Sequence, residues 1–248
     1  MPRILIVDVE RIPGMVPIFD ARVRGGYIHP SRWHSYPKTL CFSAKWLDRK
    51  AVQFYSVWKH GEDGVREKSW ELYDQADIVV TYNGRKADNK WFRNDWAVAG
   101  MNPPRPWRDV DLYLLNRKLF LFESASLDHL CERLDVQRKV DHYDVDGALA
   151  AYHGNRAEQK RIRIYNQGDV LATEAAYLRL LPWIDNHPPV GLWTGDPRVC
   201  PNCGSHDLER IGRNATPLTL YAQYRCSDCG AVSRNNFVMA RAEVRGAR

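Results

Sequence analysis

Short, strongly apolar runs recur along the first part of the chain, and polar segments separate them. Ile4–Val9 is apolar almost without interruption, which is typical of a strand buried on both faces. Two further runs flank a polar turn at Asp48–Lys50 and predict a hairpin. The five predicted strands are Ile4–Val9, Thr39–Trp46, Val52–Trp58, Ile78–Tyr82 and Val110–Leu115, the last of which passes into a helix.

Amphipathic stretches between and after these runs predict helices. Ser126 precedes a periodic apolar pattern and is the expected N-cap of one helix, and Pro182 follows the longest one. The predicted helices cover Glu67–Ala76, Lys90–Ala99, Ser126–Leu134 and residues 157–181. This order of strands and helices predicts an α/β fold in which a mixed sheet is flanked by helices.

A change of composition divides the chain. Residues 186–199 are rich in Pro and Gly, which is typical of a linker. We therefore expect a main domain over residues 1–187 and a small C-terminal domain, with its linker, over residues 188–248.

The overall composition is that of a globular protein. The 248 residues are 44% hydrophobic and 27% charged, which argues against collagen-like, coiled-coil or wholly disordered chains. No apolar run reaches the roughly 18 residues that a membrane helix needs, and the N-terminus lacks the features of a signal peptide, so we expect a cytoplasmic protein without membrane association. The net charge of +6 is compatible with a polyanionic partner.

Two carboxylates end the first predicted strand. Side chains alternate faces along a strand, so Asp8 and Glu10 point the same way, within about 7 Å of each other. Two like charges beside an apolar core are unfavourable unless one is protonated or a cation lies between them. A strand end emerging into solvent is the alternative interpretation.

Two later segments carry further candidate groups. Asp88 follows the sharp turn marked by Asn83 and falls near the start of a helix, where it could also serve as an N-cap. Tyr165 and Asp169 are four residues apart and share a helix face, which a simple surface pair would also explain. Taken together, four carboxylates from a strand, a turn and a helix can hold two divalent metals, and Mg²⁺ prefers such oxygen ligands.

These motifs resemble those of the DEDD superfamily of DnaQ-like 3′-to-5′ exonucleases. Tyr165 four residues before Asp169 matches the DEDDy branch, and segments such as TLCFSAKW, ADIVVTYNG and YNQGDV look like exonucleases encoded by bacteriophages. The resemblance implies an RNase H-like fold with a five-stranded mixed sheet. It also implies that two Mg²⁺ or Mn²⁺ ions are bound by Asp8, Glu10, Asp88 and Asp169, and that Tyr165 orients the attacking water.

One position departs from the family pattern. The residue before the second-motif aspartate is usually aromatic, whereas this chain has Ala87. Asp95 and Asp111 are therefore fallback candidates for the ligand that we assign to Asp88.

Four of the six cysteines form two C-x₂-C-G pairs near the end of the chain, Cys200 with Cys203 and Cys226 with Cys229. This spacing predicts a structural zinc ribbon, because four thiolates close a tetrahedral Zn²⁺ site. A redox dithiol pair and an iron–sulfur site are the alternatives. His206 is a competing ligand that we read as a loop residue.

Basic and aromatic residues near the motifs are candidate substrate contacts. We expect Asn83, Arg161, Arg163 and Trp33 to contact the substrate. The alternative is a solvated helix face for the two arginines and ordinary packing for Trp33. Further candidates are Lys139, Arg22 and Arg24.

The predicted function is a metal-dependent 3′-to-5′ exonuclease that hydrolyses mainly single-stranded DNA and releases nucleoside monophosphates by a two-metal-ion mechanism. DNA is the expected partner, with RNA and with replication or repair proteins as further partners. The alternatives are a structure-selective endonuclease on the same scaffold and a non-catalytic nucleic-acid-binding adaptor.

Overall fold

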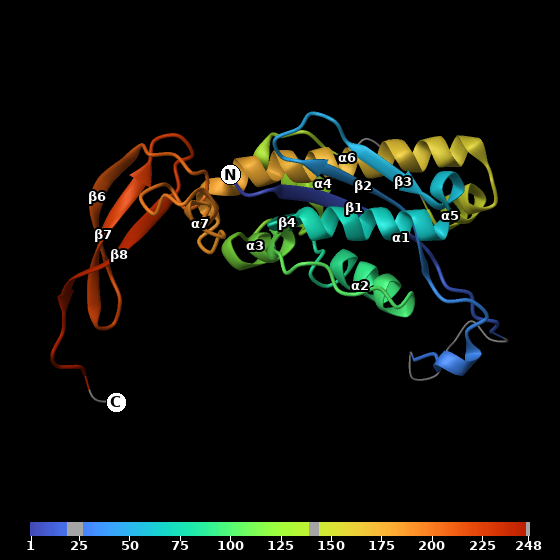
Figure 1. The fold of residues 1–248 in the computed structure, drawn as a ribbon, viewed down its shortest axis with the longest axis horizontal. Coiled ribbons are helices and arrows are strands. Elements are labelled where there is room, and N and C mark those ends of the chain that lie inside the picture. The colour runs from blue at the N-terminus through green and yellow to red at the C-terminus, as the bar shows by residue number, and fades with distance from the viewer. Residues whose placement is uncertain (19–26, 139–143, 247–248) are drawn as a thin grey trace. The chain divides into compact units, whose positions relative to one another are not determined.

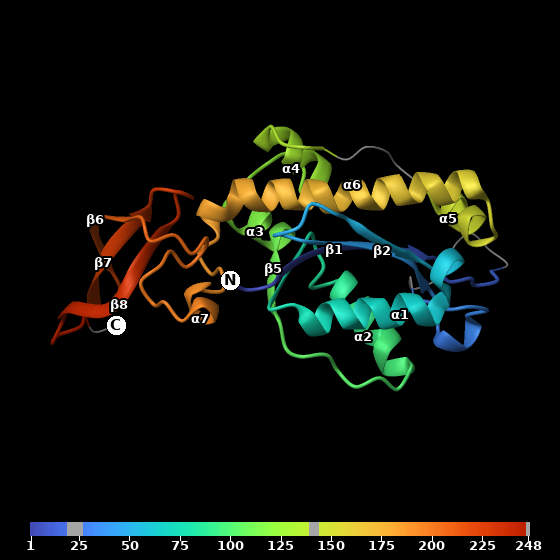
Figure 2. The same ribbon diagram turned by 45° about the horizontal axis from the view of Figure 1, so that its top comes forward.

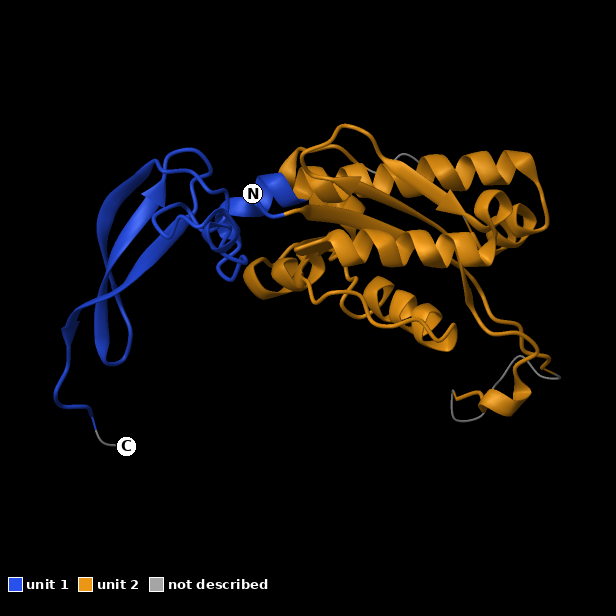
Figure 3. Ribbon diagram, viewed as in Figure 1, with its two compact units in different colours: residues 1–2, 177–248 blue, residues 3–176 orange. Residues whose placement is uncertain are grey.

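The computed structural model describes residues 1–18, 27–138 and 144–246. The chain divides into two compact units (Figure 3): residues 3–176, and residues 177–248 together with residues 1–2. Within the described residues, no helix combines the length and the apolar character needed to cross a membrane.

The larger unit is built on a five-stranded mixed sheet in the order β3-β2-β1-β4-β5. Pairing is antiparallel from β3 through β2 to β1, and parallel from β1 through β4 to β5. The predicted mixed sheet is therefore confirmed. The strands are β1 (Ile4–Ile12), β2 (Lys38–Trp46), β3 (Gln53–Ser56), β4 (Ile78–Thr81) and β5 (Arg108–Asp111).

Helices cover both faces of this sheet (Figures 1 and 2). The helices α1 (Val57–Gln75) and α2 (Asp88–Val98) lie on one face, and α6 (Arg156–Leu180) runs along the other, with α5 (Val145–Tyr152) beside its start. The larger unit also contains α3 (Leu112–Leu119), α4 (Leu127–Leu134) and the short 3₁₀ turn Pro30–Arg32, whereas the 3₁₀ turn Leu181–Trp183 belongs to the smaller unit.

The continuous apolar run of β1 follows from its central position. Leu5, Val7 and Val9 pack into a core with residues of α1 and α2. On the other face, Ile12 packs with Ala148 and Ile162 of α5 and α6. A strand buried on both faces has no solvent side to carry polar residues, and this explains why alternation appears only where Asp8 and Glu10 begin.

Several predicted boundaries are wrong, and the largest differences surround α1 and β5. The predicted strand Val52–Trp58 ends at Ser56, and α1 begins at Val57, ten residues before the predicted start. Gly61 interrupts α1 with a φ of 70°, which breaks the periodicity that would have revealed this first turn. The predicted strand from Val110 ends at Asp111, whose carboxylate caps α3 instead, and α5 was not predicted.

The smaller unit contains a three-stranded antiparallel sheet, β6-β7-β8. Its core gathers Cys200, Cys226 and Ala231, with the other two paired cysteines packed against them. The predicted linker is not wholly irregular, because it includes the short helix α7 (Gly191–Thr194). The strands are β6 (Leu208–Ala215), β7 (Thr219–Cys226) and β8 (Val232–Arg241).

Candidate active site

The strand β1 presents Asp8 and Glu10 just beyond its pairing with β4. That pairing ends at Ile6, which lies opposite Val80. Both carboxylates are half-buried and follow the apolar part of the strand on one face. They therefore lie at the edge of the core, where charges are partly desolvated yet accessible.

The helix α6 brings a third carboxylate to the same place. One oxygen each of Asp8, Glu10 and Asp169 lies within 4.8 Å of the other two. Asn166, which is fully buried one turn before Asp169, donates from Nδ2 to the carboxylate of Asp8 at 2.7 Å and to its backbone carbonyl at 3.2 Å. The amide of Asn166 thus fixes Asp8 in position against α6.

Asp88 lies next to these groups but outside their 4.8 Å cluster. It is the first residue of α2, after the N-cap Ala87, and is 6% exposed. Burial, with a smaller contribution from the charge of Asp111, raises the pKa of Asp88 to about 7, although hydrogen bonds from its own backbone N–H and from that of Val9 oppose the rise. The bond to Val9 places this carboxyl beside the strand residue that separates Asp8 from Glu10.

The turn before α2 is held by Asp111, at the end of β5. Its carboxylate accepts hydrogen bonds from the backbone N–H groups of Asn83 at 3.0 Å and Arg85 at 3.1 Å, and also from two at the start of α3. Asn83 has a φ of 68°, and a Cβ on Gly84 would lie 2.5 Å from the side chain of Thr81. Only glycine fits at position 84, and Asp111 has a structural role that accounts for its burial.

Asp95, the other fallback candidate, also has a hydrogen-bond partner. It accepts a hydrogen bond from the Thr39 hydroxyl at 2.6 Å. It lies two turns along α2 from Asp88 and lines a separate pocket, described below. Neither fallback residue belongs to the carboxylate cluster found among the described residues.

The carboxylate cluster fits a divalent cation. Three like charges within 4.8 Å repel one another at the edge of an apolar core, and a hard cation with oxygen ligands would relieve that repulsion. The raised pKa of Asp88 agrees with this, because a buried carboxylate without a nearby cation is disfavoured in its charged form.

The predicted substrate contacts are spread more widely. Arg161 lies one turn before Tyr165 on α6 and is 3.7 Å from Glu158, whereas Arg163 lies over the ring of Phe54. Trp33 packs against Gly14 and stacks on Tyr36 at 6.0 Å. These placements leave their substrate roles as predictions, and the further candidates Lys139, Arg22 and Arg24 lie outside the described residues.

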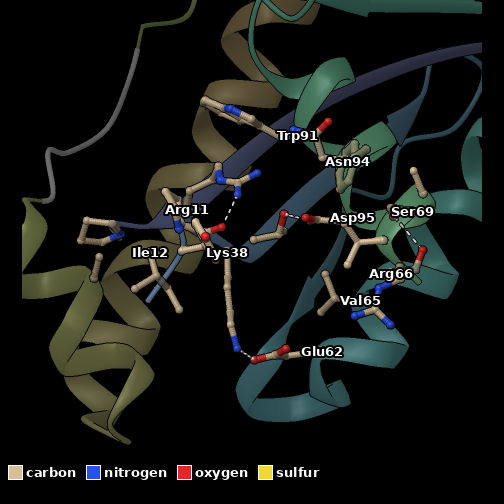
Figure 4. A pocket seen from close by; sticks show the side chains of 18 of the residues that line it. Arg11, Ile12, Lys38, Glu62, Val65, Arg66, Ser69, Trp91, Asn94 and Asp95 are labelled. Carbon is tan, nitrogen blue, oxygen red and sulfur yellow. Dashed lines mark hydrogen bonds and ion pairs between the residues drawn. The ribbon is translucent and has the colours of Figure 1, made fainter. Parts of the chain in front are cut away.

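A pocket that the sequence did not predict is lined by Arg11, the residue after Glu10 (Figure 4). It has a volume of about 1060 Å³ and is lined from β1, β2, α1, α2 and α5. Arg11 reaches into it, with its guanidinium 5.1 Å from the ring centre of Trp91 and one N–H donated to the carbonyl of Pro37. Its buried Nε and Nη1 have no hydrogen-bond partner.

Burial lowers the pKa of Arg11, and the charge of Asp95 partly compensates. Buried donors without partners are unfavourable, so an incoming acceptor would be bound well at this point. The one signal available in the sequence was the position of a basic residue directly after the carboxylate pair.

The cysteines of the smaller unit form a second cluster. Their four Sγ atoms lie within 4.8 Å of one another, with 3.6 Å between those of Cys200 and Cys229 and between those of Cys203 and Cys226. Four thiolates at about 2.3 Å from one tetrahedral zinc are separated by nearly this distance. The cluster therefore fits a zinc ribbon. His206 is 76% exposed and lies 3.7 Å from Asp196, outside the cysteine cluster.

A mixed sheet covered by helices on both faces, with carboxylates at the end of its central strand, defines the class to which the larger unit belongs. The chain is a member of the RNase_H superfamily, whose family model matches residues 34–181. That range begins after β1 and includes Asp88, Tyr165 and Asp169. The predicted RNase H-like fold is thereby confirmed.

A solved structure of a family B DNA polymerase from the hyperthermophilic archaeon Pyrobaculum calidifontis is similar in fold. The alignment covers 88% of this chain and 31% of the polymerase, with a TM-score of 0.56 and 16% sequence identity. The chain thus corresponds to less than a third of that protein, and the similarity concerns the fold. No curated protein matches the chain.

Proposed function

We propose that the chain is a metal-dependent 3′-to-5′ exonuclease of the DEDDy type, acting mainly on single-stranded DNA and releasing nucleoside monophosphates. The observation that carries the proposal is the meeting of Asp8 and Glu10 from β1 with Asp169 from α6. Membership of the RNase_H superfamily supports a nuclease, and nucleases with this fold use divalent metals. The origin in a bacteriophage stays a prediction.

In this proposal Asp8, Glu10, Asp88 and Asp169 hold the two cations. Bound cations would activate a water and stabilise the charge that develops on the phosphate. Asn166 keeps Asp8 oriented. Tyr165 would accept or donate a hydrogen bond to the attacking water, because its neutral phenol can do either near pH 7.

The pocket at Arg11 is the proposed path of the strand beside the carboxylates. A phosphate would satisfy the two unpartnered donors of Arg11. Trp91 holds the guanidinium from the other side, so the charge is positioned before substrate arrives.

The test uses single-stranded DNA labelled at its 5′ end, with Mg²⁺ or Mn²⁺. We expect a ladder that shortens from the 3′ end, lost in Asp169→Asn and retained in Glu71→Gln, which replaces an exposed carboxylate outside both the cluster and the Arg11 pocket. Internal cuts that persist when the 3′ end is blocked would instead indicate an endonuclease. Binding without cleavage of DNA or of the matching RNA would refute catalysis and favour an adaptor.

A further inference from the structure

The zinc ribbon carries a sheet whose two faces differ in chemistry. In an antiparallel pair, residues directly opposite each other project to the same face. The register places Tyr221 opposite Val238, Gln223 opposite Arg234 and Thr219 opposite Arg241. We call the face formed by Thr219, Tyr221, Gln223, Arg225, Arg234, Val238 and Arg241 the arginine face.

Contacts between side chains agree with this assignment. The guanidinium of Arg234 lies 4.0 Å from the centre of the Tyr221 ring, so the two stack across the strands. A hydrogen bond with Thr219 lowers the pKa of Tyr221, and interactions with Arg234 and Arg241 lower it further. The potential at this face is therefore positive.

The arginines of this face are open to solvent. Arg225, Arg234 and Arg241 are all exposed, and no carboxylate among the described residues forms an ion pair with them. The face has one acidic side chain among the described residues, Glu209, opposite Arg225 at the cysteine end. Neither Arg234 nor Arg241 has an acidic residue opposite it in the strand register.

Their spacing suits a chain of phosphates rather than a single anion. Their partners Gln223 and Thr219 are four residues apart on β7, which corresponds to about 13 Å along the strand. Two strand positions this far apart allow the guanidinium groups to contact different phosphates of one strand. All nine basic Lys or Arg residues from position 177 onward are arginine, the residue that both stacks on bases and binds phosphate in two-pronged fashion.

We infer that the arginine face binds the backbone and bases of single-stranded nucleic acid, with Arg234 and Arg241 on phosphates and the Arg234–Tyr221 stack as a platform for a base. Aromatic and guanidinium planes accept any base, so binding here would be independent of sequence. An acidic protein would use the positive charge but not the stack. The inference rests on the proposed function only in taking the bound strand to be the substrate.

The opposite face supplies a matched control. Arg210 and Arg213 lie opposite Tyr224 and Ala222 and are also exposed, and Arg210 contacts the sulfur of Met239. Arg210→Gln with Arg213→Gln removes the same charge from the same sheet as Arg234→Gln with Arg241→Gln. Zinc content and melting temperature of both full-length proteins would verify that the ribbon stays folded.

Binding of a labelled 30-nucleotide single-stranded DNA is measured in an Asp169→Asn background at several salt concentrations. The arginine-face variant should raise Kd at least about tenfold at low salt and reduce the slope of log Kd against log salt by about 1.4, or about 0.7 per lost phosphate contact. The opposite-face variant should remain within about twofold. Unchanged affinity and slope in the arginine-face variant, or an equal loss in the opposite-face variant, would overturn the inference.

A second measurement separates this inference from the proposed function. With the active site intact, the arginine-face variant should degrade the 30-mer more slowly but hydrolyse the p-nitrophenyl ester of thymidine 5′-monophosphate normally, because that ester is too small to span both sites. A wild-type chain that binds DNA through the arginine face but hydrolyses neither substrate would refute the exonuclease and support the binding face.

Discussion

Replacing Asp88 with Asn should stabilise the protein while abolishing its activity. Asp88 is 6% exposed, and burial raises its pKa from 3.8 to about 7. Its pKa in the unfolded chain is lower than in the folded one, so the unfolded state loses its proton first as pH rises. Stability is therefore lost between about pH 4 and pH 7 and then stays level, at least as far as this group is concerned.

The expected size follows from the same values. A rise from 3.8 to about 7 corresponds to about 4 kcal/mol of unfolding free energy at pH 8, since each pKa unit is worth about 1.4 kcal/mol. Asn keeps the shape and removes the charge. Urea unfolding without added divalent metal should show Asp88→Asn more stable than the wild type by up to about 4 kcal/mol at pH 8, with the difference shrinking toward pH 4.

Asp111→Asn provides a comparison, because Asp111 is similarly buried at 8% exposure but accepts four backbone N–H bonds, although its charge also contributes to the raised pKa of Asp88. It should destabilise the protein by about 1–3 kcal/mol, since an amide cannot accept all four. Added Mg²⁺ should stabilise the wild type and have less effect on Asp88→Asn. If Asp88→Asn proves no more stable than the wild type at pH 8, the carboxyl is not desolvated and this reasoning fails.

Three further outcomes follow from the contacts described. Lys45→Met should lower the free energy of unfolding in urea by about 3 kcal/mol, because it leaves the largely buried Glu174 without its partner. Adding Glu174→Leu should restore most of this stability, and a double variant as unstable as Lys45→Met would contradict the reasoning. Cys229→Ser should lose zinc in metal analysis and expose residues 188–248 to protease, and retained zinc would count against a four-cysteine site. Arg11→Gln should raise KM for single-stranded DNA by about tenfold with little change in kcat, whereas Arg49→Gln, which removes an exposed arginine outside the pocket lining, should not. Equal effects would refute the proposed strand path.

The sequence was sufficient for the parts of the site that depend on local periodicity. Alternation along β1 puts Asp8 and Glu10 on one face, and the helical repeat puts Tyr165 with Asp169. These two motifs come together if the buried central strand packs against the long helix. In the structure, oxygens of Asp8, Glu10 and Asp169 lie within 4.8 Å of one another.

Other features depend on contacts between distant segments, which no local pattern encodes. The pocket around Arg11 exists because the end of β1 and the start of β2 meet the middle of α1, the second half of α2 and the start of α5. The start of α1 was hidden because Val52–Trp58 has strand-like composition and Gly61 breaks the helical repeat. The structural role of Asp111 could not be predicted from the sequence, because two of its N–H donors, Asn83 and Arg85, lie 28 and 26 residues earlier in the chain.

Asp88 and Asp111 are both buried carboxylates, but they differ in the backbone N–H groups that balance their charge. Asp111 receives four backbone N–H groups, which balance its charge. Asp88 receives two, and these do not offset its burial. A protein gains nothing in stability from such a group, so its presence beside Asp8 and Glu10 is best explained by a cation that binds there during function. The opposite signs expected for Asp88→Asn and Asp111→Asn therefore test the assignment of the fourth carboxylate without an activity assay.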